Sequence, residues 1–302
     1  MDIDDAIHYG FLVAAAYGIA TSDLKQRAGE CIKKEFDTFD RKYKVVSTIY
    51  GNDLGTKLHD KRAFYKVSYG FVLQDAEGNV VIPIRGTDGI LEWLHDSSFL
   101  QHPCPFLRGA GNTEDGFTSI YQTLSIDPDY KTSVKDGLKT LQFDQPIKSI
   151  TLCGHSLGGA LVTLLALDIA GNTDLDPNVF SYASPRTGDQ LFADTFNSLV
   201  KTSYRIANEL DVVPKLPLEH PMPPLPNYRH VDGLYSLNGD DVSMTIRCEH
   251  ILPTYQYLLG KVPGIKTPSP PIEPTCSFKV TDIPEFLELI PEFNPFSLSS
   301  QN

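Results

Sequence analysis

The chain has no apolar run of the roughly 18 residues that a membrane-spanning helix requires. It is also poor in positive charge, because 26 lysines and arginines stand against 38 aspartates and glutamates, which gives a net charge of −12. This acidic balance argues against nucleic acids and anionic membrane surfaces as partners. We therefore expect a soluble protein with no integral membrane segment, for which neutral substrates remain open.

Cysteines are few and widely spaced. Five are present, an odd number, so at least one thiol is free within the chain. No CxxC or cysteine–histidine spacing typical of a zinc site occurs, and we expect no metal and no cofactor. One or two disulfides are possible but not required among Cys31, Cys104, Cys153, Cys248 and Cys276.

The N-terminus lacks the basic residues that begin a secretory signal peptide. Its apolar stretch YGFLVAAAYGIA (9–20) follows the acidic MDIDDAIH. Ile7, Phe11 and Ala14 or Ala15 recur at helical spacing, which predicts a buried N-terminal helix. The protein is then either cytoplasmic, or secreted with a leader that was removed before this numbering begins.

Strand and helix patterns alternate through the middle of the chain. Apolar, β-branched runs predict strands over 66–73, 80–87, 147–153, 178–185 and 202–208, the first two joined by a hairpin-like turn. Helices are predicted over 158–172 and 188–200, and around Val134, Leu138 and Leu141. This alternation favours an α/β fold, with a central, mainly parallel sheet and helices on both faces.

Proline-rich stretches interrupt the pattern twice. PKLPLEHPMPPLP (214–226) can be neither helix nor central strand, which predicts an extended surface loop. The tail is also rich in proline, yet it is apolar. We predict one domain over 1–260 and an extension over 261–302 that packs along the body, with a partner contact as the alternative.

Ser156 lies in TLCGHSLGGAL (151–161), between a predicted buried strand and a predicted helix. A serine there sits on a sharp, strained turn with its hydroxyl exposed for attack on a carbonyl group. Gly154 and Gly158 are needed because Cβ atoms would clash where strand and helix meet. The helix N-terminus directs free N–H groups at this turn, so the N–H of Leu157 can bind an oxyanion.

Five segments in this order resemble the class 3, fungal-type triacylglycerol lipase family. That family is a branch of the α/β-hydrolases that also contains feruloyl esterases and some phospholipases. The resemblance covers residues 5 to about 258, and it implies an α/β-hydrolase fold with a helical lid. The segments are PIRGTDGILEWLHD (83–96), CGHSLGGAL (153–161), YASPRTGD (182–189), RIANELDVVPKLP (205–217) and EHILPTYQYL (249–258).

A serine nucleophile needs a histidine base and a carboxylate that orients it. His155 is adjacent to Ser156 and points elsewhere, so it is interpreted as a neighbour. The resemblance assigns the base to His250, with His230 and His220 as alternatives, and the acid to Asp211, which ends a predicted strand. The competing carboxylates are Asp189, which is expected to cap the next helix, together with Asp194 and Glu209.

The resemblance also suggests the second oxyanion donor and the lid. Thr87 matches the family's serine or threonine at the oxyanion, whereas Arg85 is expected to be structural. A one-sided apolar stripe follows directly, in the predicted lid over about 88–100. An ordinary surface helix is the alternative for this stripe, which consists of Ile90, Leu91, Trp93 and Leu94.

These residues together predict a serine carboxylic ester hydrolase that cleaves acylglycerols through an acyl-enzyme, with a lipid or ester substrate at an oil–water interface. A feruloyl esterase or a short-chain carboxylesterase is the alternative within the same chemistry. A non-enzymatic binding protein should lack a member of the triad or of the oxyanion hole, and none is missing.

Overall fold

The computed structural model describes residues 1–23, 35–38, 41–52, 66–87, 99–127, 131–239 and 245–265. The stripe Ile90, Leu91, Trp93 and Leu94 in the predicted lid lies outside these residues, as do Cys31, Cys276 and the extension beyond residue 265. The described cysteines, Cys104, Cys153 and Cys248, are buried and form no disulfide. No helix in the described part of the chain is long and apolar enough to cross a membrane.

An eight-stranded sheet forms the centre of the molecule, in the order β1-β2-β3-β4-β7-β8-β9-β10. The strands from β1 to β4 pair antiparallel, and those from β4 to β10 pair parallel. The strands are β1 (Glu35–Thr38), β2 (Arg41–Asn52), β3 (Lys66–Gln74), β4 (Asn79–Ile84), β7 (Ser149–His155), β8 (Pro177–Tyr182), β9 (Thr202–Asn208) and β10 (Leu234–Leu237).

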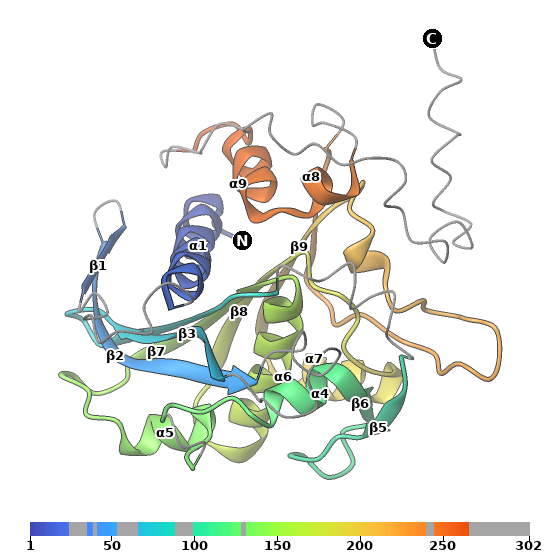
Figure 1. Ribbon diagram of the computed structural model, residues 1–302, viewed down its shortest axis with the longest axis horizontal. Coiled ribbons are helices and arrows are strands. Elements are labelled where there is room, and N and C mark those ends of the chain that lie inside the picture. Colours follow the sequence, from blue (N-terminus) through green and yellow to red (C-terminus); the bar gives the residue numbers. More distant parts are fainter. Residues whose placement is uncertain are drawn as a thin grey trace.

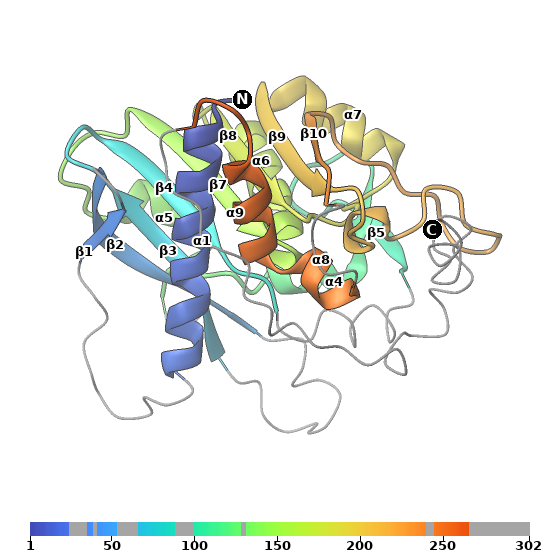
Figure 2. The ribbon, with the colours of Figure 1, turned by 90° about the horizontal axis from the view of Figure 1, so that it is seen from above.

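Helices cover both faces of the sheet (Figures 1 and 2). One face carries α1 (Ile3–Asp23) and α9 (Leu252–Gly260), with the short α8 (Ile246–His250) beside α9. The other face carries α6 (Leu157–Asn172), which packs on β7 and β8 and is flanked by α4 (Asp115–Tyr121), α5 (Val134–Thr140) and α7 (Gln190–Leu199). A small sheet of β5 (Gln101–Pro103) and β6 (Asn112–Glu114) lies outside the main one.

Each face of the sheet has its own apolar core. Along β7, Leu152 belongs to the core under α6, and Cys153 to the core under α1 and α9. This alternation follows from the period of two along a strand. Helix α6 is buried almost all round, which explains its near-continuous apolar sequence. The expected α/β architecture, with helices on both faces of the sheet, is therefore confirmed.

Three details of the structure differ from the sequence prediction. The predicted N-terminal helix is present as α1 and Ile7 is buried in it, but Val13 and Ala16 are also buried, whereas Ala14 is exposed and Phe11 and Ala15 are half-buried. The predicted proline loop begins with a 3₁₀ turn, η1 (Val213–Lys215), because proline fits the first turn of a helix. The strands β2 and β10 had not been predicted at all.

Candidate active site

The turn between β7 and α6 holds Ser156 in a strained backbone conformation, with φ of 60° and ψ of −127°. A positive φ is rare for a residue with a side chain, and it persists only where the surroundings enforce it. The N–H of Ser156 donates a hydrogen bond to the carbonyl oxygen of Tyr182 at 2.9 Å, which fixes the turn against β8. The strand runs to His155, two residues further than expected, so the turn is confined to Ser156 itself.

The glycines around this turn leave no room for a side chain. A Cβ atom on Gly154 would lie 2.2 Å from the carbonyl oxygen of Gly158. One on Gly158 would lie 2.3 Å from the carbonyl oxygen of Ile84, at the end of β4. These backbone contacts let α6 start directly against two parallel strands.

Three elements bring Ser156, His250 and Asp211 together. The Nε2 atom of His250, the last residue of α8, lies 2.9 Å from the Oγ atom of Ser156. Its Nδ1 atom lies 2.8 Å from Oδ2 of Asp211, which follows β9. With Nδ1–H donating to the carboxylate, Nε2 is left to accept the serine hydroxyl proton. All three residues are buried, and Ser156 and Asp211 are fully so.

Asp211 is held by further groups that the sequence did not indicate. The hydroxyl of Tyr255, on α9, donates to Oδ2 at 2.7 Å, and the N–H of Val213 donates to Oδ1 at 2.9 Å. Burial, and next the charge of Asp211, raise the pKa of Tyr255 well above its usual value, so its hydroxyl keeps its proton. Since Tyr255 lies in EHILPTYQYL, five residues after His250, this quoted segment was the available signal.

A second series of hydrogen bonds links the backbone of His250 to His155, Tyr17 and Gly86. The Nε2 of His155 lies 2.7 Å from the carbonyl oxygen of His250, which can only accept, so this nitrogen carries the hydrogen. Burial, and next the nearby His250, lower the pKa of His155 well below its usual value, so the ring is neutral. Its Nδ1 therefore accepts the Tyr17 hydroxyl at 2.9 Å, and the oxygen of Tyr17 accepts the N–H of Gly86 at 2.9 Å.

The loop after β4 lies beside Ser156. A Cβ atom on Gly86 would be 3.0 Å from the Cβ of Ser156, and Thr87 is the next residue. Arg85 stabilises this loop from behind, because its guanidinium donates to the carbonyl oxygens of Ser68 at 2.8 Å and of Gly86 at 2.6 Å. On the other side, Leu157 is the first residue of α6.

The alternative histidines and carboxylates of the sequence analysis form no hydrogen bond or ion pair with Ser156 or His250 in the described chain. Each has a local role instead, and Asp189 caps α7 by accepting from the N–H of Phe192 at 2.8 Å, as expected. The ring of His230 lies 2.6 Å from the carbonyl oxygen of Pro214, Glu209 accepts from Ser236, Asp194 accepts from Gln190, and His220 is exposed. Within the same described ranges, no cluster of three or more histidine, cysteine or acidic residues could hold a metal ion.

Solved structures of lipases share this fold. Lip2 lipase from Yarrowia lipolytica matches with a TM-score of 0.54 and 20% identity, over 78% of each chain. A triacylglycerol lipase from Penicillium expansum matches with a TM-score of 0.52 and 23% identity, over 78% of this chain and 80% of that one. At such identities the likeness concerns the fold, which is that of the α/β-hydrolases.

The sequence comparisons define the family more narrowly. The sequence model of class 3 lipases matches residues 81–220. Phospholipase A1-II 1 from Oryza sativa subsp. indica is 30% identical over 261 residues, which cover 72% of this chain and 66% of that protein. Secreted mono- and diacylglycerol lipase 1 from Fusarium solani is 26% identical over 213 residues, or 70% and 55% of the two chains. The chain thus spans between about half and two thirds of these relatives, and it belongs to the class 3 lipase family.

Proposed function

We propose that this protein is a serine carboxylic ester hydrolase that acts on acylglycerols. The observation that carries the proposal is the hydrogen-bonded order Ser156 Oγ, His250 Nε2, His250 Nδ1 and Asp211 Oδ2, with successive contacts of 2.9 and 2.8 Å. A buried serine held at positive φ before a helix N-terminus is the arrangement that acyl transfer by an α/β-hydrolase requires. The class 3 lipase family supports lipid esters as the substrate class.

The proposed reaction proceeds through an acyl-enzyme. Ser156 Oγ attacks the ester carbonyl carbon while its proton passes to Nε2 of His250, and Asp211 stabilises the imidazolium. The N–H groups of Thr87 and Leu157 hold the oxyanion. The alcohol leaves with the proton from His250, and a water molecule activated by the same nitrogen then hydrolyses the acyl-enzyme to a free acid.

Two ester classes are candidates for the substrate. Similarity to the mono- and diacylglycerol lipase of Fusarium solani supports acylglycerols as the first candidate. The apolar stripe with Trp93 is interpreted as a lid for an oil–water interface. Similarity to the rice phospholipase A1, which has the higher identity of the two relatives, supports the acyl esters of phospholipids as the second candidate. Feruloyl and short-chain esters remain alternatives with the same chemistry.

The first test measures hydrolysis of tributyrin as its concentration passes the solubility limit, with Ser156→Ala as the blank. We expect a rise in rate at the limit, because an apolar lid opens at an interface, and a loss of about 10⁶-fold in kcat in the Ser156→Ala variant. Smooth saturation below the limit would favour an esterase with an open site. Activity on phosphatidylcholine but not on tributyrin would select the second candidate, and no activity above the blank on any of these esters or on feruloyl esters would refute the proposal.

A further inference from the structure

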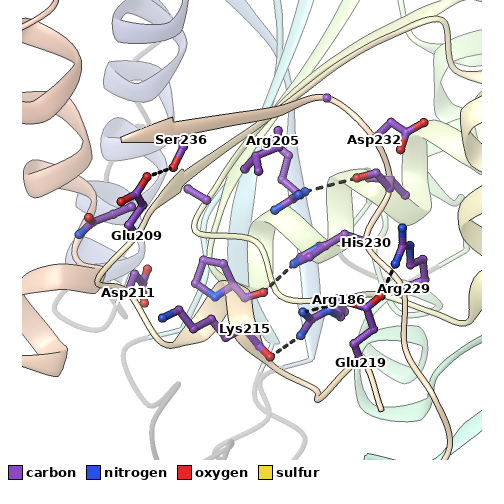
Figure 3. Close-up of a pocket in the computed structure, with 16 residues that line it drawn as sticks. Arg186, Arg205, Glu209, Asp211, Lys215, Glu219, Arg229, His230, Asp232 and Ser236 are labelled. Carbon is purple, nitrogen blue, oxygen red and sulfur yellow. Dashed lines mark hydrogen bonds and ion pairs between the residues drawn. The ribbon is translucent and has the colours of Figure 1, made fainter. Parts of the chain in front are cut away.

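A cavity of about 600 Å³ lies on the far side of the loop that carries Asp211. Its walls are β9, β10, the segment 209–233 and Arg186, and neither Ser156 nor His250 lines it. Figure 3 shows Arg205 approaching the cavity from one wall and Arg186 from the opposite one, with His230 between them. Four of the chain's 26 basic residues line this one space: Arg186, Arg205, Lys215 and Arg229.

Arg205 is buried, and no carboxylate forms an ion pair with it in the described part of the chain. Its side chain starts from β9, the residue is only 9% exposed, and its Nε donates to the carbonyl oxygen of Val231 at 3.3 Å. Among the described residues no carboxylate lies within 4.0 Å of its guanidinium, and no other hydrogen bond uses its terminal nitrogens. A buried charge that lacks a partner is costly, so proteins almost always supply one. Burial, and next the repulsion from Arg186, lower the pKa of Arg205 to about 10, which still leaves it charged.

Four acidic residues also line the cavity, and three of them already have partners of their own. Glu219 binds both Arg229 and, at 3.6 Å, Arg186. Glu209 accepts a hydrogen bond from Ser236 at 2.8 Å, and Asp211 is occupied by His250 and Tyr255. Asp232 is exposed to solvent, and its charge acts on Arg205 by raising its pKa, but the two groups form no ion pair. Lys215 also has no ion pair within the described chain, so two cations of the cavity are left without an ion pair.

Arg186 is fixed in place, which gives the cavity a rigid wall. Its Nη1 atom donates to the carbonyl oxygen of Pro217 at 2.8 Å and also to that of Lys215. Charged donors that are already held in position lose little conformational entropy when they bind a ligand. Guanidinium groups match phosphate oxygens with several parallel donors, and cations from different walls suit a tetrahedral anion.

We propose that this cavity is a binding site for a phosphate group. A volume of about 600 Å³ exceeds what inorganic phosphate fills and lies within the usual range for ligand pockets, so a phosphate ester fits. Free phosphomonoesters and phospholipid headgroups present the same group, and they are distinguished below. The site goes beyond the proposed hydrolase activity and does not require turnover, because its walls include no group that attacks an ester.

The test uses the Ser156→Ala variant of the full chain, so that binding is measured without hydrolysis. Isothermal titration with inorganic phosphate and with glycerol 3-phosphate, at constant ionic strength and against chloride, is expected to give saturable binding with Kd below about 1 mM. Adding Arg205→Gln should weaken this binding by at least about tenfold, because the guanidinium contacts are lost. The matched control is Lys201→Gln, an exposed lysine paired with Asp176 outside the cavity, which should bind as before.

A second arm identifies the source of the phosphate. Co-sedimentation with phosphatidylcholine vesicles, with and without phosphatidic acid, should show Arg205-dependent binding if the ligand is a lipid headgroup, and none if it is a free phosphomonoester. Should Arg205→Gln not fold, Arg205→Lys keeps the charge but not the planar donors, and it should still weaken phosphate binding. No saturable binding in either arm, or equal binding with and without Arg205, would overturn the proposal.

Discussion

A single hydroxyl group at Tyr17 joins two segments of the candidate active site, the loop after β4 and the end of α8. It accepts the N–H of Gly86, next to the proposed oxyanion donor Thr87, and it donates to His155, whose other nitrogen bonds the backbone of His250. In this series of hydrogen bonds, the N–H of Gly86 and the Nε2–H of His155 must donate, so the Tyr17 hydroxyl must donate to Nδ1 of His155. Tyr17 therefore positions both the proposed oxyanion loop and the end of α8 that carries the proposed base.

Replacing Tyr17 by phenylalanine tests this role. The change leaves the N–H of Gly86 and Nδ1 of His155 without partners, and we expect kcat for tributyrin to fall about 10- to 100-fold, with KM changed little. Tyr235→Phe is the matched control, since the hydroxyl of Tyr235 on β10 makes no hydrogen bond to any described residue and its removal should leave kcat unchanged. Equal turnover in the Tyr17→Phe variant and the unmodified protein would rule out the positioning role.

Single residues of the site could be predicted where their sequence neighbours form a pattern, but their contacts with residues distant in the sequence could not. Ser156 was identifiable because glycines, strand and helix adjoin it in the sequence, and the geometry brings it to His250 and Asp211. The partners Tyr17 and Tyr255 lie 138 residues from His155 and 44 residues from Asp211 respectively. The segment EHILPTYQYL places Tyr255 near His250 in sequence but does not report its contact with Asp211, and nothing near Tyr17 reports its contact, since the position of each depends on how helices dock on the sheet.

Among the helices, α4 depends on a buried carboxyl group. Glu114 caps its first turn by accepting from the N–H of Phe117 at 2.6 Å, and it is only 3% exposed. Burial is the largest influence on this group and raises the pKa of Glu114 to about 7, although the N–H groups of Phe117 and Gly116 act in the opposite direction. The folded protein therefore holds this proton more tightly than the unfolded chain does.

The raised pKa of Glu114 makes the free energy of unfolding depend on pH. Because the pKa of Glu114 is raised on folding, its contribution to the free energy of unfolding is full below about pH 4.5 and is lost as the pH rises through about 7, by at most roughly 3 kcal/mol. Glu114→Gln, which can still cap Phe117, should remove this loss. Urea unfolding at pH 5 and pH 8 measures it, with Asp174→Asn, a change at an exposed aspartate away from α4, as the control. The same pH dependence with and without Glu114 would contradict the prediction.

Helix α1 shows why its buried face was predicted wrongly. Its sequence is apolar or small on nearly all sides, so several helical faces fit the period equally well. The face that is buried is chosen by the neighbours, because α1 packs on β3, β4 and β7 and against α9. Strand β2 was missed for a related reason, since its outer residues are polar and partly exposed and its pairing with β3 contains bulges.

The molecule as a whole has two apolar cores that share one sheet. Ile7 belongs to the core under α1, and Leu164 to the core under α6. Each is fully buried, so Ile7→Ala and Leu164→Ala should each lower the free energy of unfolding by about 2–5 kcal/mol. Because both cores use the same strands, both changes should shift one cooperative transition.

Thermal unfolding followed by far-ultraviolet and near-ultraviolet circular dichroism checks this expectation. Coincident transitions that both variants shift would agree with a single folding unit. Two separate transitions, only one of which responds to Ile7→Ala, would show that the faces unfold independently. Glu77→Gln is the control, because Glu77 lies in an exposed turn and contributes to neither core.

The packing of α1 against α9 has a consequence for synthesis on the ribosome (Figure 2). Helix α1 leaves the ribosome before α9, so the partners of its apolar face include a helix that is translated much later. Ser156 is likewise made 94 residues before His250. The nascent chain therefore carries its proposed nucleophile without a base, and an uncovered apolar helix that chaperones can bind, until the last described helix has emerged.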